Sequence, residues 1–186
     1  MFCGSSRGTD PAHAALARAL GAALAERRMT LIFGGGRVGL MGVIADAALA
    51  AGGPVIGVIP EFLKRPELAH GGVADMIVVE SMHARKQRMF ELADAFAVLP
   101  GGIGTLDEAI EVITWKQLGL HDKPVLLVDS RGYWQPLRAL LAHAASEGFF
   151  AMPERPLYRL VGSVEGLFST LASLPAIAPL AEADRL

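Results

Sequence analysis

The sequence predicts an α/β protein: a doubly wound parallel sheet with helices on both faces, in a single domain. Short apolar runs alternate with longer segments of helical period along the chain. The runs are apolar throughout, which is typical of parallel strands covered on both faces. No internal repeat and no Gly/Ser-rich or Pro-rich linker divides the chain. We therefore expect one domain over residues 1–174 and a peripheral tail over 175–186.

Five apolar runs, most of them rich in β-branched residues, are bounded by Gly, Pro or Asp and predict buried strands. They are TLIFG (30–34), PVIGVIP (54–60), MIVVE (76–80), AFAVLP (95–100) and PVLLVD (124–129). MFCGS (1–5) predicts a further strand. Ala- and Leu-rich segments between the runs have the length and spacing of helices. These cover about residues 11–28, 39–52, 82–94, 105–119 and 133–147.

The composition limits the class of function. The 186 residues are 52% hydrophobic and carry a formal net charge of -2. The chain has no excess of Lys and Arg to neutralise a polyanion, so we expect no nucleic-acid partner. Its longest apolar runs are far shorter than the ~20 residues that span a bilayer, and its single Cys cannot form an internal disulfide. We expect a cytoplasmic protein without a membrane partner.

Three predicted strands end in turns of glycine and small residues. The turns are CGSSRG (3–8), FGGGRVGLMG (33–42) and LPGGIGTLDE (99–108). Ligands of doubly wound sheets bind beyond the carboxyl ends of the strands. Glycine permits close backbone approach there, and the following helix offers unpaired N–H groups and the positive end of its dipole. The turns therefore predict phosphate binding, and Ser5 and Ser6 either contact the ligand or form the turn.

The middle turn also suggests a dinucleotide. Gly34, Gly36 and Gly39 have the G-x-G-x-x-G spacing, and Glu61 follows the next predicted strand. Tight turns alone explain these glycines equally well, and a dinucleotide site would leave the other two turns unexplained. We favour a phosphorylated small molecule over NAD.

Two candidate catalytic residues lie outside the glycines. Thr105 and Glu108 have the spacing of a capping box, but a carboxylate at the mouth of a phosphate-binding turn could equally stabilise a cationic transition state. Arg85 and Lys86 fall on the apolar side of a predicted helix. Either their heads reach solvent along apolar stems, or they have anionic partners, for which a substrate phosphate and Glu108 are the candidates.

These residues resemble a known family. SMHARK (81–86), LPGGIGTLDE (99–108) and VITWKQLGLHDKPV (112–125) are similar in motif and spacing to the LOG ("lonely guy") proteins, the cytokinin-activating 5'-monophosphate phosphoribohydrolases. CGSS, GGGRVGLMG and VIGVIP also match, so the resemblance covers about residues 2–130. It implies a Rossmann-like homodimer that cleaves the N-glycosidic bond of N6-modified adenosine 5'-monophosphates, with no metal or redox cofactor.

The resemblance also implies site residues. Arg85 and Glu108 fall on the family's catalytic pair. The implied substrate-binding residues are Glu67, Arg85, Lys86, Gly101, Gly102, Ile103, Gly104, Thr105, Leu106, Asp107, Glu108 and Thr114. Glu67 and Thr114 rest on the resemblance alone. No residue stands out as the acid that protonates the leaving base.

Three other functions stay open at this point. The chain could be a nucleosidase of unmodified AMP or a nucleotide-binding carrier without catalysis. Members of the family are also labelled lysine decarboxylases. One parallel-sheet domain of 186 residues leaves little room for a pyridoxal phosphate enzyme, so we disfavour that activity.

Overall fold

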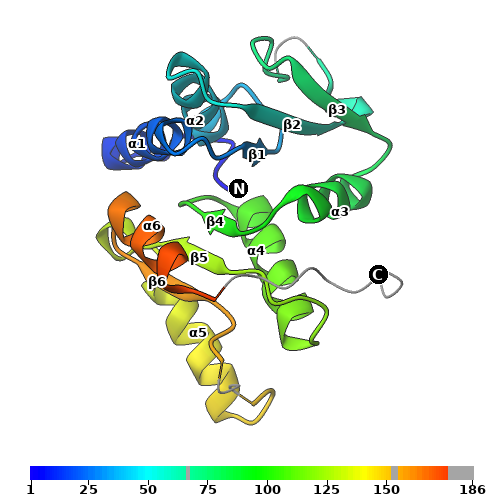
Figure 1. Cartoon of the computed structure of the whole chain (residues 1–186). Coiled ribbons are helices and arrows are strands. Elements are labelled where there is room, and N and C mark those ends of the chain that lie inside the picture. The colour runs from blue at the N-terminus through cyan, green and yellow to red at the C-terminus, as the bar shows by residue number, and fades with distance from the viewer. Residues whose placement is uncertain (66–67, 152–154, 176–186) are drawn as a thin grey trace.

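The computed structural model describes residues 1–65, 68–151 and 155–175. Helices and strands alternate along them, as predicted (Figure 1). The strands are β1 (Leu31–Phe33), β2 (Val55–Pro60), β3 (Asp75–Val79), β4 (Phe96–Val98), β5 (Val125–Val128) and β6 (Arg159–Val161). The helices are α1 (Pro11–Glu26), α2 (Gly39–Ala50), α3 (Met82–Leu92), α4 (Ile103–Gln117), α5 (Gln135–Ser146) and α6 (Val164–Ser173), with short 3-10 turns η1 (Glu61–Leu63) and η2 (Ser130–Gly132).

The strands form two parallel three-stranded sheets, ordered β1-β2-β3 and β4-β5-β6. The N-terminal segment lies between them (Figure 1). The nitrogen of Met1 donates to the carbonyl of Ile32 at 2.9 Å, and Phe2 forms a parallel bridge with Val98. The strand predicted over residues 1–5 is therefore a single bridge, because the chain turns out of the sheet at Gly4. The strand order reverses at this segment, with β1-β2-β3 on one side and β4-β5-β6 on the other, and a doubly wound sheet binds its ligands at such a point.

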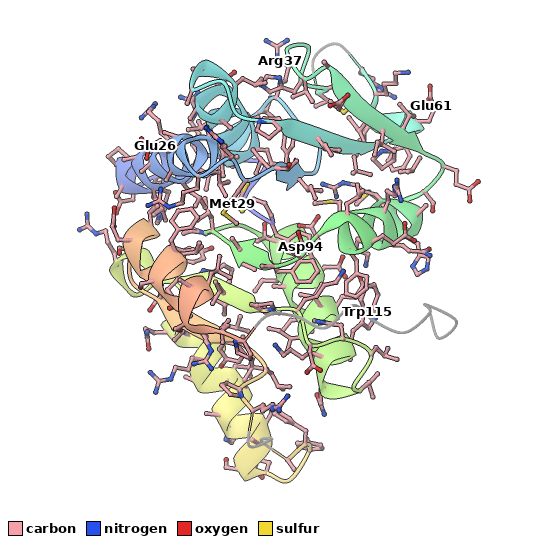
Figure 2. The ribbon with its side chains drawn as sticks, in the orientation of Figure 1. Glu26, Met29, Arg37, Glu61, Asp94 and Trp115 are labelled. Carbon is pink, nitrogen blue, oxygen red and sulfur yellow. The ribbon has the colours of Figure 1, made fainter. Side chains whose placement is uncertain are left out.

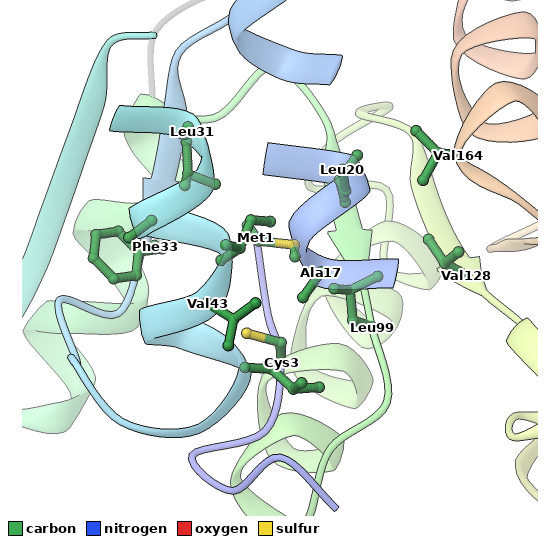
Figure 3. Close-up of a cluster of buried hydrophobic side chains, with 14 of the residues drawn as sticks. Met1, Cys3, Ala17, Leu20, Leu31, Phe33, Val43, Leu99, Val128 and Val164 are labelled. Atoms are coloured by element: carbon green, nitrogen blue, oxygen red, sulfur yellow. The ribbon is translucent and has the colours of Figure 1, made fainter. Parts of the chain in front are cut away.

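Each face of the sheet has its own hydrophobic core, because neighbouring residues of a strand point to opposite faces. In β5, Leu126 and Val128 pack with side chains of α1, α2 and α6. Val125 and Leu127 pack with side chains of α3 and α4. Figure 3 shows the first core, where Met1 and Cys3 reach between the helices. The doubly wound arrangement predicted from the sequence is confirmed.

The chain beyond residue 150 contains two elements that the sequence analysis missed, β6 and α6. β6 has three residues and, among the described strands, pairs only with β5. Such a short edge strand lacks the long apolar run by which the other strands were found. α6 follows directly, and its N-cap Ser163 accepts a hydrogen bond from the nitrogen of Gly166 at 3.0 Å.

Two predictions about the whole chain are not tested by the structure. Most of the tail predicted over residues 175–186 lies outside the described residues, which end at Pro175. Within the described part of the chain, none of the helices has the length and apolar character needed to cross a bilayer. The cytoplasmic location stays a prediction.

Candidate active site

A pocket of about 330 Å³ opens at the carboxyl ends of β1, β2 and β4. Its lining residues are Cys3, Ser5, Gly34, Gly36, Val38, Met41, Ile59, Leu63, Leu68, Arg85, Gly102, Ile103, Gly104, Thr105 and Glu108. Two other hollows of about 470 Å³ each lie at the opposite ends of strands, beside Thr30 and Ala95 and beside Pro124 and Arg159. Because ligands of this sheet type bind at the carboxyl ends, we take the smaller pocket as the candidate site.

A buried ion pair forms one wall of the pocket. Arg85 Nη1 donates to Glu108 Oε1 at 3.0 Å, and the two residues are 8% and 7% exposed. Arg85 lies on the buried side of α3 with Met89 and Phe90. Its helix begins at Met82, and the Oγ of the N-cap Ser81 accepts a hydrogen bond from the nitrogen of Ala84. The packing of α3 thus directs the guanidinium toward α4.

The backbone supplies the other acceptors of Arg85. Nε donates to the carbonyl of Val58 at 3.2 Å, and Nη2 lies 3.5 Å from the carbonyl of Gly34. A Cβ at Gly34 would overlap Nη2 of Arg85. The glycine at position 34 therefore makes room for the side chain of Arg85. This steric requirement explains Gly34 without a dinucleotide-binding site.

Burial changes the proton affinity of two groups in the pocket. Desolvation raises the pKa of Glu108 above its ordinary value of 4.5, and the positive charge of Arg85 opposes this only in part. Desolvation also raises the pKa of the Cys3 thiol, to about 12, and the carboxylate of Glu108 adds to the effect. Cys3 is therefore a neutral buried thiol at pH 7, and we assign it no nucleophilic role.

The N-terminus of α4 points its unpaired N–H groups at the pocket rim. The helix begins at Ile103 with Gly102 as N-cap, and no side chain caps it. N–H groups in the first turn of a helix have no intrahelical partner. Thr105 is already the third helical residue, and Glu108 bonds to Arg85. The capping-box interpretation is therefore wrong: the helix starts two residues earlier than predicted.

The glycine turns are hydrogen-bonded to one another. The nitrogen of Gly4 donates to the carbonyl of Pro100 at 3.1 Å, and the nitrogen of Leu40 donates to the carbonyl of Gly4 at 2.9 Å. A Cβ at Gly101 would overlap Thr105 and lie 2.8 Å from the nitrogen of Gly4. Only a glycine at position 101 allows this close packing of the first and third turns.

Lys86 has carboxylate partners on α4. Its Nζ lies 3.1 Å from Oδ2 of Asp107 and 3.0 Å from Oε1 of Glu111. Burial alone would lower the pKa of Lys86, but the hydrogen bonds and charges of the two carboxylates raise it above the ordinary value. The side chain is 16% exposed and does not line the pocket. The prediction of anionic partners is therefore confirmed for Lys86, but the partners are Asp107 and Glu111 rather than Glu108, and the lysine links α3 to α4.

The other predicted substrate-binding residues lie in different places. Leu106 packs into the core beneath α4, and Gly101 lies behind the rim, against Gly4. Thr114 is exposed on α4. It lies six positions after Glu108, which is ~9 Å along the helix axis and ~120° around it. Thr114 therefore does not face the pocket of its own chain. Glu67 lies outside the described residues.

The sequence analysis missed the apolar wall of the pocket. Val38 and Met41 come from the start of α2, Ile59 from β2, and Leu63 and Leu68 from the segment that follows β2. Of these residues, only Ile59 could have been predicted from the sequence, because it lies near the end of a predicted strand and strand ends line ligand sites. The others are single apolar residues that no motif distinguishes. Ser5 does line the pocket.

Glu61, the acidic residue considered for a dinucleotide ribose, is exposed in η1 at the outer edge of the molecule (Figure 2). It is not among the residues that line the pocket. In the described residues, no three His, Cys, Asp or Glu side chains come together in a group that could hold a metal ion.

Solved structures of other proteins share this fold. The molybdenum cofactor binding protein from Rippkaea orientalis superimposes with a TM-score of 0.68 at 23% identity, covering 90% of each chain. The Moco carrier protein from Chlamydomonas reinhardtii gives a TM-score of 0.65 at 22% identity, again over 90% of each chain. At this identity, the likeness concerns the fold alone.

Relatives in sequence are far closer. The cytokinin riboside 5'-monophosphate phosphoribohydrolase of Rhodococcoides fascians is 45% identical over 174 residues, which are 93% of this chain and 88% of the relative. An enzyme of the same name from Arabidopsis thaliana is 46% identical over 151 residues, 81% of this chain and 70% of the relative. A family model described as "Possible lysine decarboxylase" matches residues 41–171. The chain therefore belongs to the LOG family, the lysine decarboxylase-like proteins that include the cytokinin riboside 5'-monophosphate phosphoribohydrolases.

Proposed function

We propose that this protein is a phosphoribohydrolase that cleaves the N-glycosidic bond of N6-modified adenosine 5'-monophosphates, releasing the free base and ribose 5-phosphate. The observation that carries the proposal is the buried Arg85–Glu108 pair beside the N-terminus of α4 in one pocket. A carboxylate can stabilise the positive charge that develops on the ribose, and a helix N-terminus can bind the 5'-phosphate. The relatives of that name, at 45% and 46% identity, support the same chemistry.

The reaction assigns Glu108 the central role. Breaking the bond between C1' and N9 builds positive charge on the ribose, as in glycoside hydrolysis. An ionised carboxylate next to that carbon stabilises the charge and can orient the attacking water. Arg85 holds Oε1 of Glu108, so we assign the second oxygen, Oε2, to the substrate. Arg85 and Glu108 together form the proposed catalytic pair.

The phosphate is assigned to the glycine turn. We place it against Gly102, Ile103, Gly104 and Thr105, where N–H groups and the helix dipole favour an anion, and Gly101 supports these residues from behind the rim. Lys86, Leu106 and Asp107 support this turn from the α3 side and from the core. Lys86 in particular acts on the substrate through the position of α4, since both of its carboxylate partners lie on that helix.

The apolar wall is assigned to the base. Met41, Ile59, Leu63 and Leu68 lie in the same pocket as Glu108 and offer no charge to a purine. An apolar N6 substituent gains by burial against such a wall, whereas the bare amino group of AMP leaves it uncovered. This feature favours N6-modified substrates over AMP.

We also propose that the protein is a homodimer that uses the outer face of α4. Ile103 at the start of this helix and Leu118 at its C-cap are 86% and 67% exposed, and Thr114 lies exposed between them. Exposed large apolar side chains on one helix are typical of a contact surface. A second copy on this face would approach the pocket through Ile103, which also lines it. In that arrangement, Thr114 serves the partner's pocket.

The first test compares substrates. Wild-type protein should release base from N6-isopentenyladenosine 5'-monophosphate with a kcat/KM at least about tenfold above that for AMP, because the apolar wall binds the added group. Chromatography of free base measures both rates. A preference for AMP would instead identify an AMP nucleosidase, and binding without base release would identify a carrier. Cadaverine formed from lysine with added pyridoxal phosphate would overturn the proposal.

Glu108→Gln should lose at least about a hundredfold in kcat, because the charge that stabilises the cationic transition state is gone. The amide oxygen can still accept the hydrogen bond from Arg85, so circular dichroism should show a folded protein. Glu91→Gln is the matched control, since Glu91 is exposed on α3 and pairs with Arg88. Retained activity in Glu108→Gln would remove Glu108 from the catalytic pair.

The raised pKa of Glu108 predicts the acid limb of the pH profile. The ionised form is the active one, so activity should fall as the pH falls through a pKa above 4.5. The substrate phosphate also titrates near pH 6. The direct measurement is therefore the carboxyl carbon resonance that is absent from Glu108→Gln, followed in the ligand-free protein. A midpoint at or below 4.5 would show that burial does not dominate at this carboxyl.

Sedimentation equilibrium should give twice the chain mass of 19.6 kDa. Leu118→Asp should shift the protein toward monomer, because a charge would be buried at the contact. Leu140→Asp is the control, since Leu140 is 62% exposed on α5. A wild-type mass of one chain, or equal effects of both variants, would count against the α4 interface.

A further inference from the structure

One hydrogen bond reaches the glycine turn from the second half of the chain. The hydroxyl of Tyr133 donates to the carbonyl of Gly101 at 2.7 Å. Tyr133 lies between η2 and α5, 32 positions farther along the sequence. It does not line the pocket, so a direct contact with substrate does not explain its position.

The ring of Tyr133 is held in place by its neighbours. Trp134, which is 1% exposed, lies edge-on to it with 5.0 Å between the ring centroids. His13 from α1 lies edge-on from another element, at 5.5 Å. The nitrogen of Trp134 donates to Oδ1 of Asp129 at 2.6 Å, which anchors this segment to the end of β5. The hydroxyl therefore belongs to a fixed group.

Gly101 packs closely against Thr105 and Gly4, but no side chain restricts the rotation of the peptide that joins Gly101 to Gly102. Gly101 and Gly102 carry no side chain, and glycine has the greatest backbone freedom of all residues. The peptide between them carries the carbonyl of Gly101 and the N–H of Gly102. In a trans peptide these two groups point in opposite directions. Among the described residues, the N–H of Gly102 meets no acceptor, and Gly102 lines the pocket.

We propose that Tyr133 is a positioning residue for the phosphate of the substrate. By holding the Gly101 carbonyl away from the pocket, its hydroxyl fixes the peptide so that the N–H of Gly102 is available to the ligand. The turn then presents its donors already oriented, which lowers the entropy lost on binding. This inference rests on the proposed function, because it places the phosphate at this turn.

The test variant is Tyr133→Phe, which keeps the ring packing and removes only the hydroxyl. We expect KM for the 5'-monophosphate substrate to rise about 3- to 10-fold, which corresponds to the net free energy of one hydrogen bond. The kcat should be nearly unchanged. The dissociation constant of ribose 5-phosphate should rise by the same factor. Binding of N6-isopentenyladenosine, which has no phosphate, should not change. Titration calorimetry measures both ligands.

Tyr158→Phe is the control, because the chain has two tyrosines and Tyr158 lies beside a hollow at the other ends of the strands. It should behave as wild type in all these measurements. Unchanged ribose 5-phosphate binding in Tyr133→Phe, or an equal loss for the nucleoside, would overturn the inference. If wild-type protein hydrolysed no nucleotide, the proposed function would fail, while the two binding constants would still decide whether Tyr133 orients an anion site.

Discussion

The buried ion pair of Arg85 and Glu108 is the constraint on which the rest of the site depends. Taking both charges out of water costs several kcal/mol per ion, and one mutual hydrogen bond does not offset that cost. The carbonyls of Val58 and Gly34 supply the missing acceptors. Val58 lies in β2 and Gly34 lies just beyond β1. The ion pair can therefore form only where α3 and α4 meet the carboxyl ends of these two strands. The absence of a side chain at Gly34 follows from the same requirement.

The N-terminal segment between the two three-stranded sheets brings the glycine turns together beside this ion pair. The N-terminal segment hydrogen-bonds to β1 through Met1 and pairs with β4 through Phe2, and it leaves the sheet at Gly4. Gly4 then links the other two glycine turns, through Pro100 and Leu40. Because the three turns are bonded to one another, the carboxylate on α4 and the unpaired N–H groups at the start of α4 keep a fixed relation to the strands behind them.

The sequence was informative where a property repeats along the chain, and uninformative where it depends on distant partners. The apolar runs predicted five strands. Four of them are largely buried, but β3 lies at a sheet edge and is partly exposed, so the prediction that it is buried was wrong. The sequence analysis missed β6 because its three residues, Arg159–Val161, form no continuous apolar run. Thr105 and Glu108 satisfy a local capping pattern, yet Arg85, 23 positions away, decides what Glu108 does. The same holds for Lys86, whose carboxylate partners lie 21 and 25 positions away. No local pattern distinguishes Met41 or Leu68 as wall residues.

The charges between α3 and α4 indicate how the site can accept an anion beside a carboxylate. Arg85 and Lys86 face Asp107, Glu108 and Glu111, so both cations already have carboxylate partners. In the proposed complex, the phosphate is therefore held by backbone N–H groups and the helix dipole, which need no counter-charge. Glu108 stays incompletely compensated, because desolvation outweighs the attraction of Arg85 and raises its pKa. A positive charge that develops on the ribose supplies the compensation that the folded protein lacks, and the carboxylate stabilises the transition state more than the neutral sugar.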